Sequence, residues 1–218
     1  MKGGDMTEQS TLRGLAVQPM FPTPIAVGMV PDAEKINADL EKIILTREQQ
    51  HPSTQHSNLG GWQSSWDMES WGGKSTAAIL AAGKSLATQL TADRQGRPIA
   101  VNWKANCWAN VNRSGNGNEF HCHPGAYWSG SYYINDGGVA ADPGLGGEFE
   151  IQDPRGPAPV MYAPLLTFAV PGGLTLGSSE LLLPRAGMMV LFPSWLMHAV
   201  RPYRGTQTRI SMAFNFSL

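Results

Sequence analysis

The sequence predicts a mainly β fold with flanking helices, and three observations support this. Gly and Pro contribute 25 and 16 of the 218 residues, well above their average combined share of about 12%, so the chain turns often. From residue 97 onward, short β-like runs recur between clusters of turn residues. Two stretches with helical apolar spacing precede them. This order is typical of a β-sandwich or jelly roll with helices packed on one sheet.

The length suits one domain over residues 1–218. Residues 1–96 are expected to form an N-terminal helical wrapper with a Trp-rich loop, and residues 97–218 the jelly-roll core.

Two helices are expected in the wrapper. The first covers residues 33–48 with Asp32 as its N-cap, and the second covers residues 76–91 with Ser75 as its N-cap. The expected apolar face of the first consists of Ile36, Leu40, Ile43 and Ile44. That of the second consists of Ile79, Ala82, Leu86 and Leu90.

A loop rich in tryptophan lies between the two helices. Trp62, Trp66 and Trp71 fall within residues 57–73. Two interpretations stay open: the indoles cover one end of the core, or they form a lid or substrate platform.

The strands of the core are expected in eight runs. These are residues 99–111, 127–134, 147–151, 160–170, 181–183, 188–192, 198–202 and 208–216. In two of them, polar side chains alternate with apolar ones. The polar face of the first run includes Asn106, Trp108, Asn110 and Asn112, and that of the last includes Arg209 and Ser211. We expect these faces to line a wet cavity, because they carry the best candidate site residues.

Charge and composition exclude several classes of protein. The formal net charge is −1, so nothing favours a nucleic acid or an anionic membrane surface as partner. No apolar run approaches the roughly 18 residues that a spanning helix needs, and the polar N-terminus lacks a signal peptide's apolar core. Two cysteines, Cys107 and Cys122, suit a reduced cytoplasmic protein. The oligomeric state stays open, with a homodimer among the options.

Three of the five histidines form a metal-binding pattern. On an extended strand, His121 and His123 would point to the same face, about 6–7 Å apart. Imidazole suits Fe(II), Zn(II) or Cu, and two nitrogens leave room for a third ligand and open positions. The third is His198, at the start of a later strand.

Arg209 is the candidate anchor for a carboxylate. If the chain makes a hairpin around Arg204 and Gly205, His198 and Arg209 become diagonal neighbours, about 7–8 Å apart. A small dicarboxylate could then bind the metal at one end and the planar guanidinium at the other.

The ordered motifs resemble the 2-oxoglutarate/Fe(II) oxygenase superfamily, and in particular its group of bacterial and phage oxygenases without an assigned substrate. The resemblance covers nearly the whole chain. It rests on Phe21-Pro-Thr-Pro-Ile25, Asn58-Leu-Gly-Gly-Trp-Gln-Ser64, His121-Cys-His123, Ser129-Gly-Ser-Tyr-Tyr-Ile134, Gly146-Gly-Glu-Phe-Glu-Ile-Gln-Asp-Pro154, Pro184-x-x-Gly187, Leu191-Phe-Pro193, His198-x-Val200 and Arg209-x-Ser211.

This resemblance implies a double-stranded β-helix, a cupin-like jelly roll that holds Fe(II) in its mouth. It implies hydroxylation of a second substrate, with 2-oxoglutarate converted to succinate and CO2. His121, His123 and His198 would bind the metal and Arg209 the co-substrate. Ser211, Tyr132, Tyr133 and Asn110 are further co-substrate candidates, and Tyr127, Trp128 and Trp108 are candidates for contact with a small-molecule or peptide substrate.

One position departs from the superfamily pattern. The usual motif is His-x-Asp or His-x-Glu, which completes a two-histidine, one-carboxylate triad, but His123 stands at the acidic position. Glu119, or more remotely Glu148 or Asp142, could supply a carboxylate; otherwise the site has three histidines. Two other functions therefore stay open: a cupin-type metal dioxygenase or isomerase, and a non-catalytic module that binds metal and 2-oxoglutarate.

Overall fold

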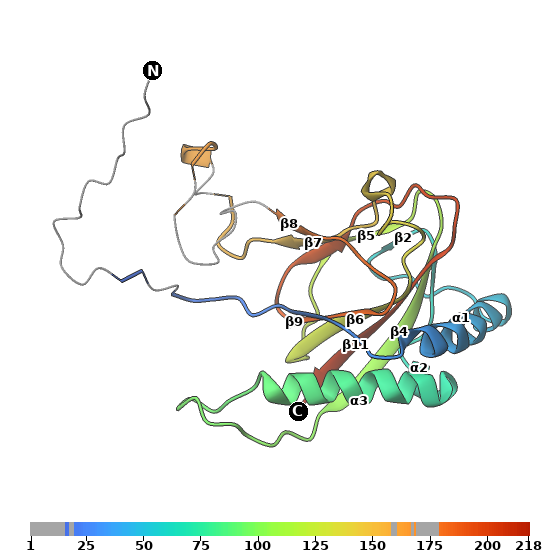
Figure 1. The fold of residues 1–218 in the computed structure, drawn as a ribbon, viewed down its shortest axis with the longest axis horizontal. Helices are drawn as coiled ribbons and strands as arrows, with labels where there is room; N and C mark the ends of the chain where they lie inside the picture. The colour runs from blue at the N-terminus through green and yellow to red at the C-terminus, as the bar shows by residue number, and fades with distance from the viewer. Residues whose placement is uncertain (1–15, 18–19, 158–160, 167, 169–178) are drawn as a thin grey trace.

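The computed structural model describes residues 16–17, 20–157, 161–166, 168 and 179–218. They form two antiparallel sheets that face each other, with the long helices on the outer side of one (Figure 1). This mainly β architecture confirms the predicted jelly roll.

The larger sheet has the strand order β1-β9-β6-β11-β4-β3. Its strands are β1 Ala26–Met29, β9 Met188–Pro193, β6 Trp128–Asn135, β11 Arg209–Ser217, β4 Lys104–Asn112 and β3 Trp62–Gln63. The smaller sheet has the order β2-β5-β10-β7-β8. Its strands are β2 Asn58–Leu59, β5 Gly117–His121, β10 His198–Val200, β7 Phe149–Gln152 and β8 Ser179–Leu182. From β4 to β7, and again from β9 to β11, successive strands alternate between the sheets, as in a double-stranded β-helix.

Three helices precede the core strands: α1 Ala33–Gln50, α2 Met68–Trp71 and α3 Gly73–Gln89. In α1, Leu40 and Ile44 are fully buried, as the periodicity predicts. Asp32 stands at the N-cap position, but its side chain makes no capping hydrogen bond.

The second predicted helix needs a larger correction. It begins at Gly73, so Ser75 lies inside it and donates a hydrogen bond to Asp39 instead of capping. Its buried face is Thr76, Ile79, Leu80, Gly83 and Ala87, whereas Ala82 and Leu90 are exposed. The face is rotated because Gly83 provides the flat surface on which Phe216 and Phe214 of β11 lie.

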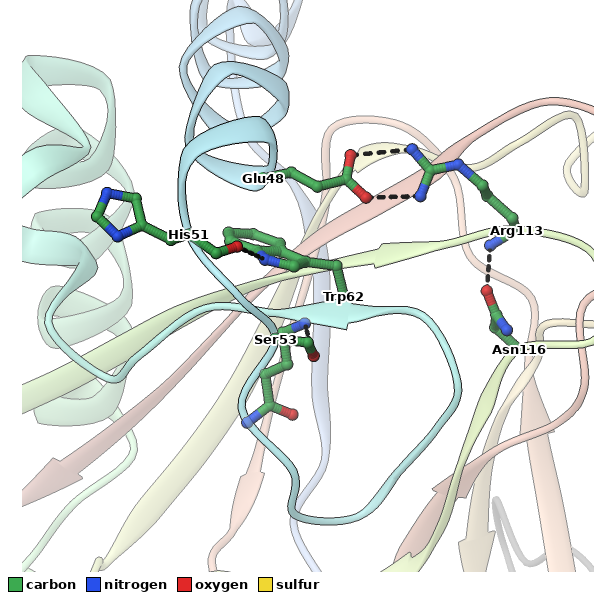
Figure 2. A network of polar contacts seen from close by, with 7 residues as sticks. Glu48, His51, Ser53, Trp62, Arg113 and Asn116 are labelled. Atoms are coloured by element: carbon green, nitrogen blue, oxygen red, sulfur yellow. Dashed lines mark hydrogen bonds and ion pairs between the residues drawn. The ribbon is translucent and has the colours of Figure 1, made fainter.

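A polar network ties the end of α1 to the sheets (Figure 2). The Glu48 carboxylate accepts two hydrogen bonds from the Arg113 guanidinium, at 2.6 and 2.9 Å. The indole nitrogen of Trp62 donates to the His51 carbonyl oxygen at 2.8 Å. These contacts hold the loop after α1 against β3 and the β4–β5 turn.

Most predicted strands are present, with shifted ends. For the run at residues 160–170, positions 161–166 and 168 form no strand, and the others lie outside the described residues. The expected hairpin between the last two strands is wrong. β10 pairs with β5 and β7 in the smaller sheet, whereas β11 pairs with β4 and β6 in the larger one.

Tyr203 explains why no hairpin forms. Its side chain is fully buried and donates to the Gly137 carbonyl oxygen at 2.6 Å. Its backbone pairs with Gly115 and Asn116. The segment between β10 and β11 is thereby held across the end of the sandwich, so the two strands enter opposite sheets.

No helix among the described residues is long and apolar enough to cross a membrane.

Candidate metal centre

Three imidazoles converge between the sheets. His121 ends β5, and His198 begins β10 directly opposite it in the antiparallel pair. Gly117 permits this pairing, because a Cβ there would lie 2.5 Å from the Val200 carbonyl oxygen. His123 follows β5 in a loop, where its backbone N–H donates to the Ser194 carbonyl oxygen at 2.9 Å. The sequence suggested that His123 lies on the same strand as His121. It lies just after that strand instead, yet it joins the same cluster.

The spacing of the ring nitrogens suits a single metal ion. Nε2 of His123 and Nε2 of His198 are 3.2 Å apart, and one ring nitrogen from each of the three histidines lies within 4.8 Å of the others. Two imidazole nitrogens bound at right angles to one ion, each at about 2.1 Å, would be about 3 Å apart.

Backbone carbonyl groups fix two of the rings. Nδ1 of His198 lies 2.8 Å from the Leu196 carbonyl oxygen, and Nδ1 of His121 lies 2.7 Å from that of Glu119. A carbonyl oxygen only accepts, so both Nδ1 atoms must carry the proton. Nε2 of each ring is then unprotonated and has the lone pair that a metal would bind.

The buried position of the cluster keeps the imidazoles neutral. Burial, together with the neighbouring histidines, lowers the pKa of His198 to about 3 and that of His123 to about 4. Burial also lowers the pKa of His121. Neutral imidazole is the form that binds metal, so at neutral pH no proton competes at this site.

Arg209 lies on the facing sheet with unpaired donors. Its side chain is 1% exposed, and its Nε and Nη2 atoms have no hydrogen-bond partner in the structure. Nη1 is 3.4 Å from Oδ1 of Asn112. The hydroxyl of Tyr133 is also buried without a partner, and the guanidinium carbon lies 5.4 Å from the centre of its ring. Buried donors of this kind call for an acceptor, and a carboxylate matches the guanidinium fork.

One pocket of about 550 Å³ joins the imidazoles to Arg209. Ser211, Asn110, Trp108 and Tyr133 line the same pocket, as the sequence suggested. His198 and Arg209 face each other across the sandwich from separate sheets and are not diagonal neighbours in one hairpin.

Three other predicted site residues point away from the pocket. On β6, Tyr133 faces inward, whereas Tyr132 and Trp128 belong to the core beneath the helices. Tyr132 donates to Asn37, and the Trp128 indole donates to Thr91. Tyr127 is 52% exposed and stacks on Trp103. Strand alternation explains the outward position of Trp128 and Tyr132, which lie on the same face of β6, whereas Tyr127 precedes the strand.

No carboxylate of the described residues joins the three imidazoles. Glu119 lines the pocket and contributes its carbonyl oxygen to His121, but its exposed side chain is not part of the cluster. Asp142 accepts a hydrogen bond from the Gly144 N–H instead. Oε2 of Glu148 is buried without a hydrogen-bond partner, away from the pocket lining. The donor set is therefore three neutral nitrogens, which suits Fe(II) or Zn(II).

Two residues near the cluster carried no signal in the sequence. Ser57 Oγ lies 3.4 Å from Nε2 of His121 and accepts a hydrogen bond from Asn118 at 3.2 Å. They meet because the short strand β2 pairs with β5, and a two-residue strand gives no periodicity to detect.

The tryptophans between α1 and α3 differ in position: two are placed to cover the core, and one is at the pocket. Trp62 and Trp71 pack into or against the core. Trp66 lines the pocket, is 50% exposed, and stacks on His56 with ring centres 4.5 Å apart.

One family model matches the part of the chain that carries the site. The family model described as "Putative 2OG-Fe(II) oxygenase" matches residues 106–215, a span that contains all three histidines and Arg209. No curated protein matches the chain.

Solved structures share the fold at low identity. A prolyl-4-hydroxylase from Pseudomonas putida is 17% identical, with a TM-score of 0.62 over 89% of this chain and 92% of that one. A Trichoplax adhaerens prolyl hydroxylase in complex with a hypoxia inducible factor peptide is 13% identical, with a TM-score of 0.63 over 88% and 83%. HygX from Streptomyces hygroscopicus, with nickel and 2-oxoglutarate bound, is 12% identical, with a TM-score of 0.54 over 89% and 83%.

Proposed function

Because the chain belongs to the 2OG-Fe(II) oxygenase family, we propose that it hydroxylates an organic substrate while converting 2-oxoglutarate and O2 to succinate and CO2. Members of this family are oxidoreductases that use Fe(II) as cofactor and 2-oxoglutarate as co-substrate. Bound in the pocket, Fe(II) supplies the redox chemistry that activates dioxygen.

One observation carries the proposal. A cluster of three neutral imidazoles and a buried guanidinium with two unpaired nitrogens share one pocket. Each half lacks a partner: the imidazoles have lone pairs without a cation, and the guanidinium has donors without an acceptor. A metal ion and a dicarboxylate satisfy both halves together.

The residues then have separate roles. His121, His123 and His198 hold the metal. Arg209 binds the distal carboxylate of 2-oxoglutarate, and the hydroxyls of Tyr133 and Ser211 are available to assist it. Phe149 and Phe192 pack on His198, with ring centres 5.1 and 4.7 Å away, and so keep water from that side of the cluster.

The test is succinate formation. The protein is loaded anaerobically with Fe(II) and 2-oxoglutarate, and succinate is measured after oxygen is admitted, with no second substrate added. Slow, uncoupled succinate production that disappears in Arg209→Met is the expected result. Loaded protein that makes none would contradict the enzymatic role.

His123 favours a second candidate function. With a neutral imidazole at the acidic position, the metal keeps one more positive charge, which alters its reactivity. A module that binds metal and 2-oxoglutarate without turnover would bind both ligands in the same experiment and release no succinate. A cupin-type enzyme would instead bind metal and leave Arg209 without a ligand, so Arg209→Met would change nothing.

A further inference from the structure

The pocket extends beyond the metal ligands, and its outer wall carries a distinct chemistry. On β11, Arg209 and Asn215 lie on the same face, six residues and therefore about 20 Å apart. The Trp108 ring lies 5.6 Å from the His123 ring, and Trp108 pairs with Ala213, between those two ends. The metal cluster thus divides the pocket into an inner part at Arg209 and an outer part at Asn215.

The outer part is polar but almost uncharged. Among the described residues that line the whole pocket, Arg209 is the one guanidinium, Glu119 is the one carboxylate, and none is lysine. Amide and hydroxyl side chains make up much of the remaining polar lining of the whole pocket. These are Ser57, Gln63, Asn106, Asn110, Asn118, Ser131, Tyr133, Ser211 and Asn215. Of these, Asn106 and Asn215 face each other at the outer end, whereas Asn110 pairs with Ser211 on the Arg209 side. Once 2-oxoglutarate holds Arg209, the described side chains of this wall offer a second ligand no guanidinium or ammonium group to pair with a phosphate or carboxylate, whereas they offer several neutral hydrogen-bonding groups.

The amide at the outer end is held in a fixed orientation. Ser129 is fully buried, and its hydroxyl donates to Oδ1 of Asn215 at 2.7 Å. Oδ1 is therefore engaged, and the Nδ2 protons are left to donate to a ligand. Asn106 pairs with Asn215 across the strands, so two amides stand side by side in this row. Such groups both donate and accept, as hydroxyl groups do.

An aromatic surface borders this row of amides. Trp66 lines the pocket, is half exposed, and is backed by the His56 ring at 4.5 Å. A rigid indole offers an apolar face on which the C–H groups of a ligand ring can pack. The amides can then form hydrogen bonds with polar groups at the edge of that ligand. The cavity of about 550 Å³ must also hold 2-oxoglutarate, which leaves room for a small second ligand.

We propose that the outer part of the pocket binds an uncharged, polyhydroxylated small molecule, such as a sugar-like ring, as the substrate to be oxidised. This inference rests on the proposed function, because it assigns Arg209 to 2-oxoglutarate. Asn215, Asn106 and Trp66 are the residues that select the substrate.

Ligand-observed saturation-transfer NMR tests it on the full chain loaded with Zn(II), which is redox-inert, and 2-oxoglutarate. The probes are methyl glycosides of glucose, galactose and mannose, glucose 6-phosphate, and a capped dialanine amide. We expect transfer to at least one neutral glycoside and less to the phosphate and the peptide. Asn215→Leu and Trp66→Ala should each weaken the glycoside affinity about three- to tenfold, without changing 2-oxoglutarate binding.

Matched controls are available in the chain. Asn102→Leu and Trp195→Ala alter an exposed amide and an exposed indole outside this pocket, and they should leave all signals unchanged. Stronger transfer to glucose 6-phosphate or to the peptide, or no transfer to any glycoside while 2-oxoglutarate is bound, would overturn the inference but leave the proposed function intact. Absence of 2-oxoglutarate binding would instead contradict the proposed function.

Discussion

Nε2 of His123 and Nε2 of His198 lie 3.2 Å apart, although 75 residues separate them in the chain. Folding holds these two neutral imidazoles together without any carboxylate of the described residues in the cluster. Without a metal, a proton on Nε2 of His123 can bridge the two atoms, and a bound cation would take the place of that proton and accept a lone pair from each ring. The predictions below follow from this arrangement and from the unpaired guanidinium across the pocket.

Removal of one imidazole should weaken metal binding. His123→Ala is expected to reduce the affinity for Co(II) or Zn(II) by more than about 100-fold, a loss larger than that for an outer-shell partner. His123→Asp should retain binding, because a carboxylate is also a metal ligand. Competition with a chromophoric chelator measures both, and His51→Ala, a change at an exposed histidine, is the control. Equal affinity in His123→Ala and the wild type would exclude His123 as a ligand.

Arg209→Met should remove 2-oxoglutarate binding and spare the metal. Loss of one partner from a buried charged pair costs about 2 kcal/mol or more, so the affinity should fall at least about 30-fold. Calorimetric titration of the Zn(II)-loaded protein measures it. The matched control is Arg204→Met, because Arg204 is exposed and does not line the pocket. An unchanged affinity in Arg209→Met would favour the cupin interpretation.

The adjacent tyrosines of β6 should respond in opposite ways. Tyr133→Phe removes a hydroxyl that is buried without a partner, so it should weaken 2-oxoglutarate binding without lowering stability. Tyr132→Phe removes the donor to Asn37 and should cost about 1 kcal/mol of unfolding free energy with no effect on 2-oxoglutarate. Urea unfolding and calorimetry separate the two. If Tyr132→Phe weakened 2-oxoglutarate binding and Tyr133→Phe lowered the unfolding free energy, Tyr133 would not be the tyrosine of β6 that faces the pocket.

The metal-free protein should lose stability as the pH falls below about 6.5. Burial lowers the pKa of His198 from 6.5 to about 3, so the unfolded chain takes up a proton that the folded one does not. For this one residue the loss between pH 7 and pH 5 is about 2 kcal/mol. In His198→Phe the drop in unfolding free energy between these two pH values should be smaller by about that amount. An equal drop in both proteins would mean that His198 is not buried in neutral form.

Local patterns in the sequence predicted much of the fold and of the site. The alternation along residues 209–216 placed Arg209 and Ser211 on the inner face, and helical spacing located α1. The pairing of β10 could not be read in this way, because strand partners depend on where a connection is anchored. Tyr203, whose buried hydroxyl holds that connection, looks like an ordinary turn residue in the sequence.

Other positions that the sequence did not predict also depend on contacts between distant parts of the chain. The double tyrosine of β6 gave no indication of which ring faces inward, since one step along a strand reverses the face. Ser57 and Asn118 reach His121 through the pairing of β2 with β5. The mixed roles of Trp62 and Trp66 depend on packing against α1 and on the pocket rim, which no periodic pattern in the loop specifies.

The central claim is that three histidines gather one Fe(II) beside an arginine that holds 2-oxoglutarate. Anaerobic titration with Fe(II) in the presence of 2-oxoglutarate tests it directly, through the visible charge-transfer absorption of the ternary complex. We expect a band that saturates at one metal per chain in the wild type and in Arg204→Met, and that is absent in His198→Ala. No band in the wild type with iron bound, or an unchanged band in His198→Ala, would contradict the claim.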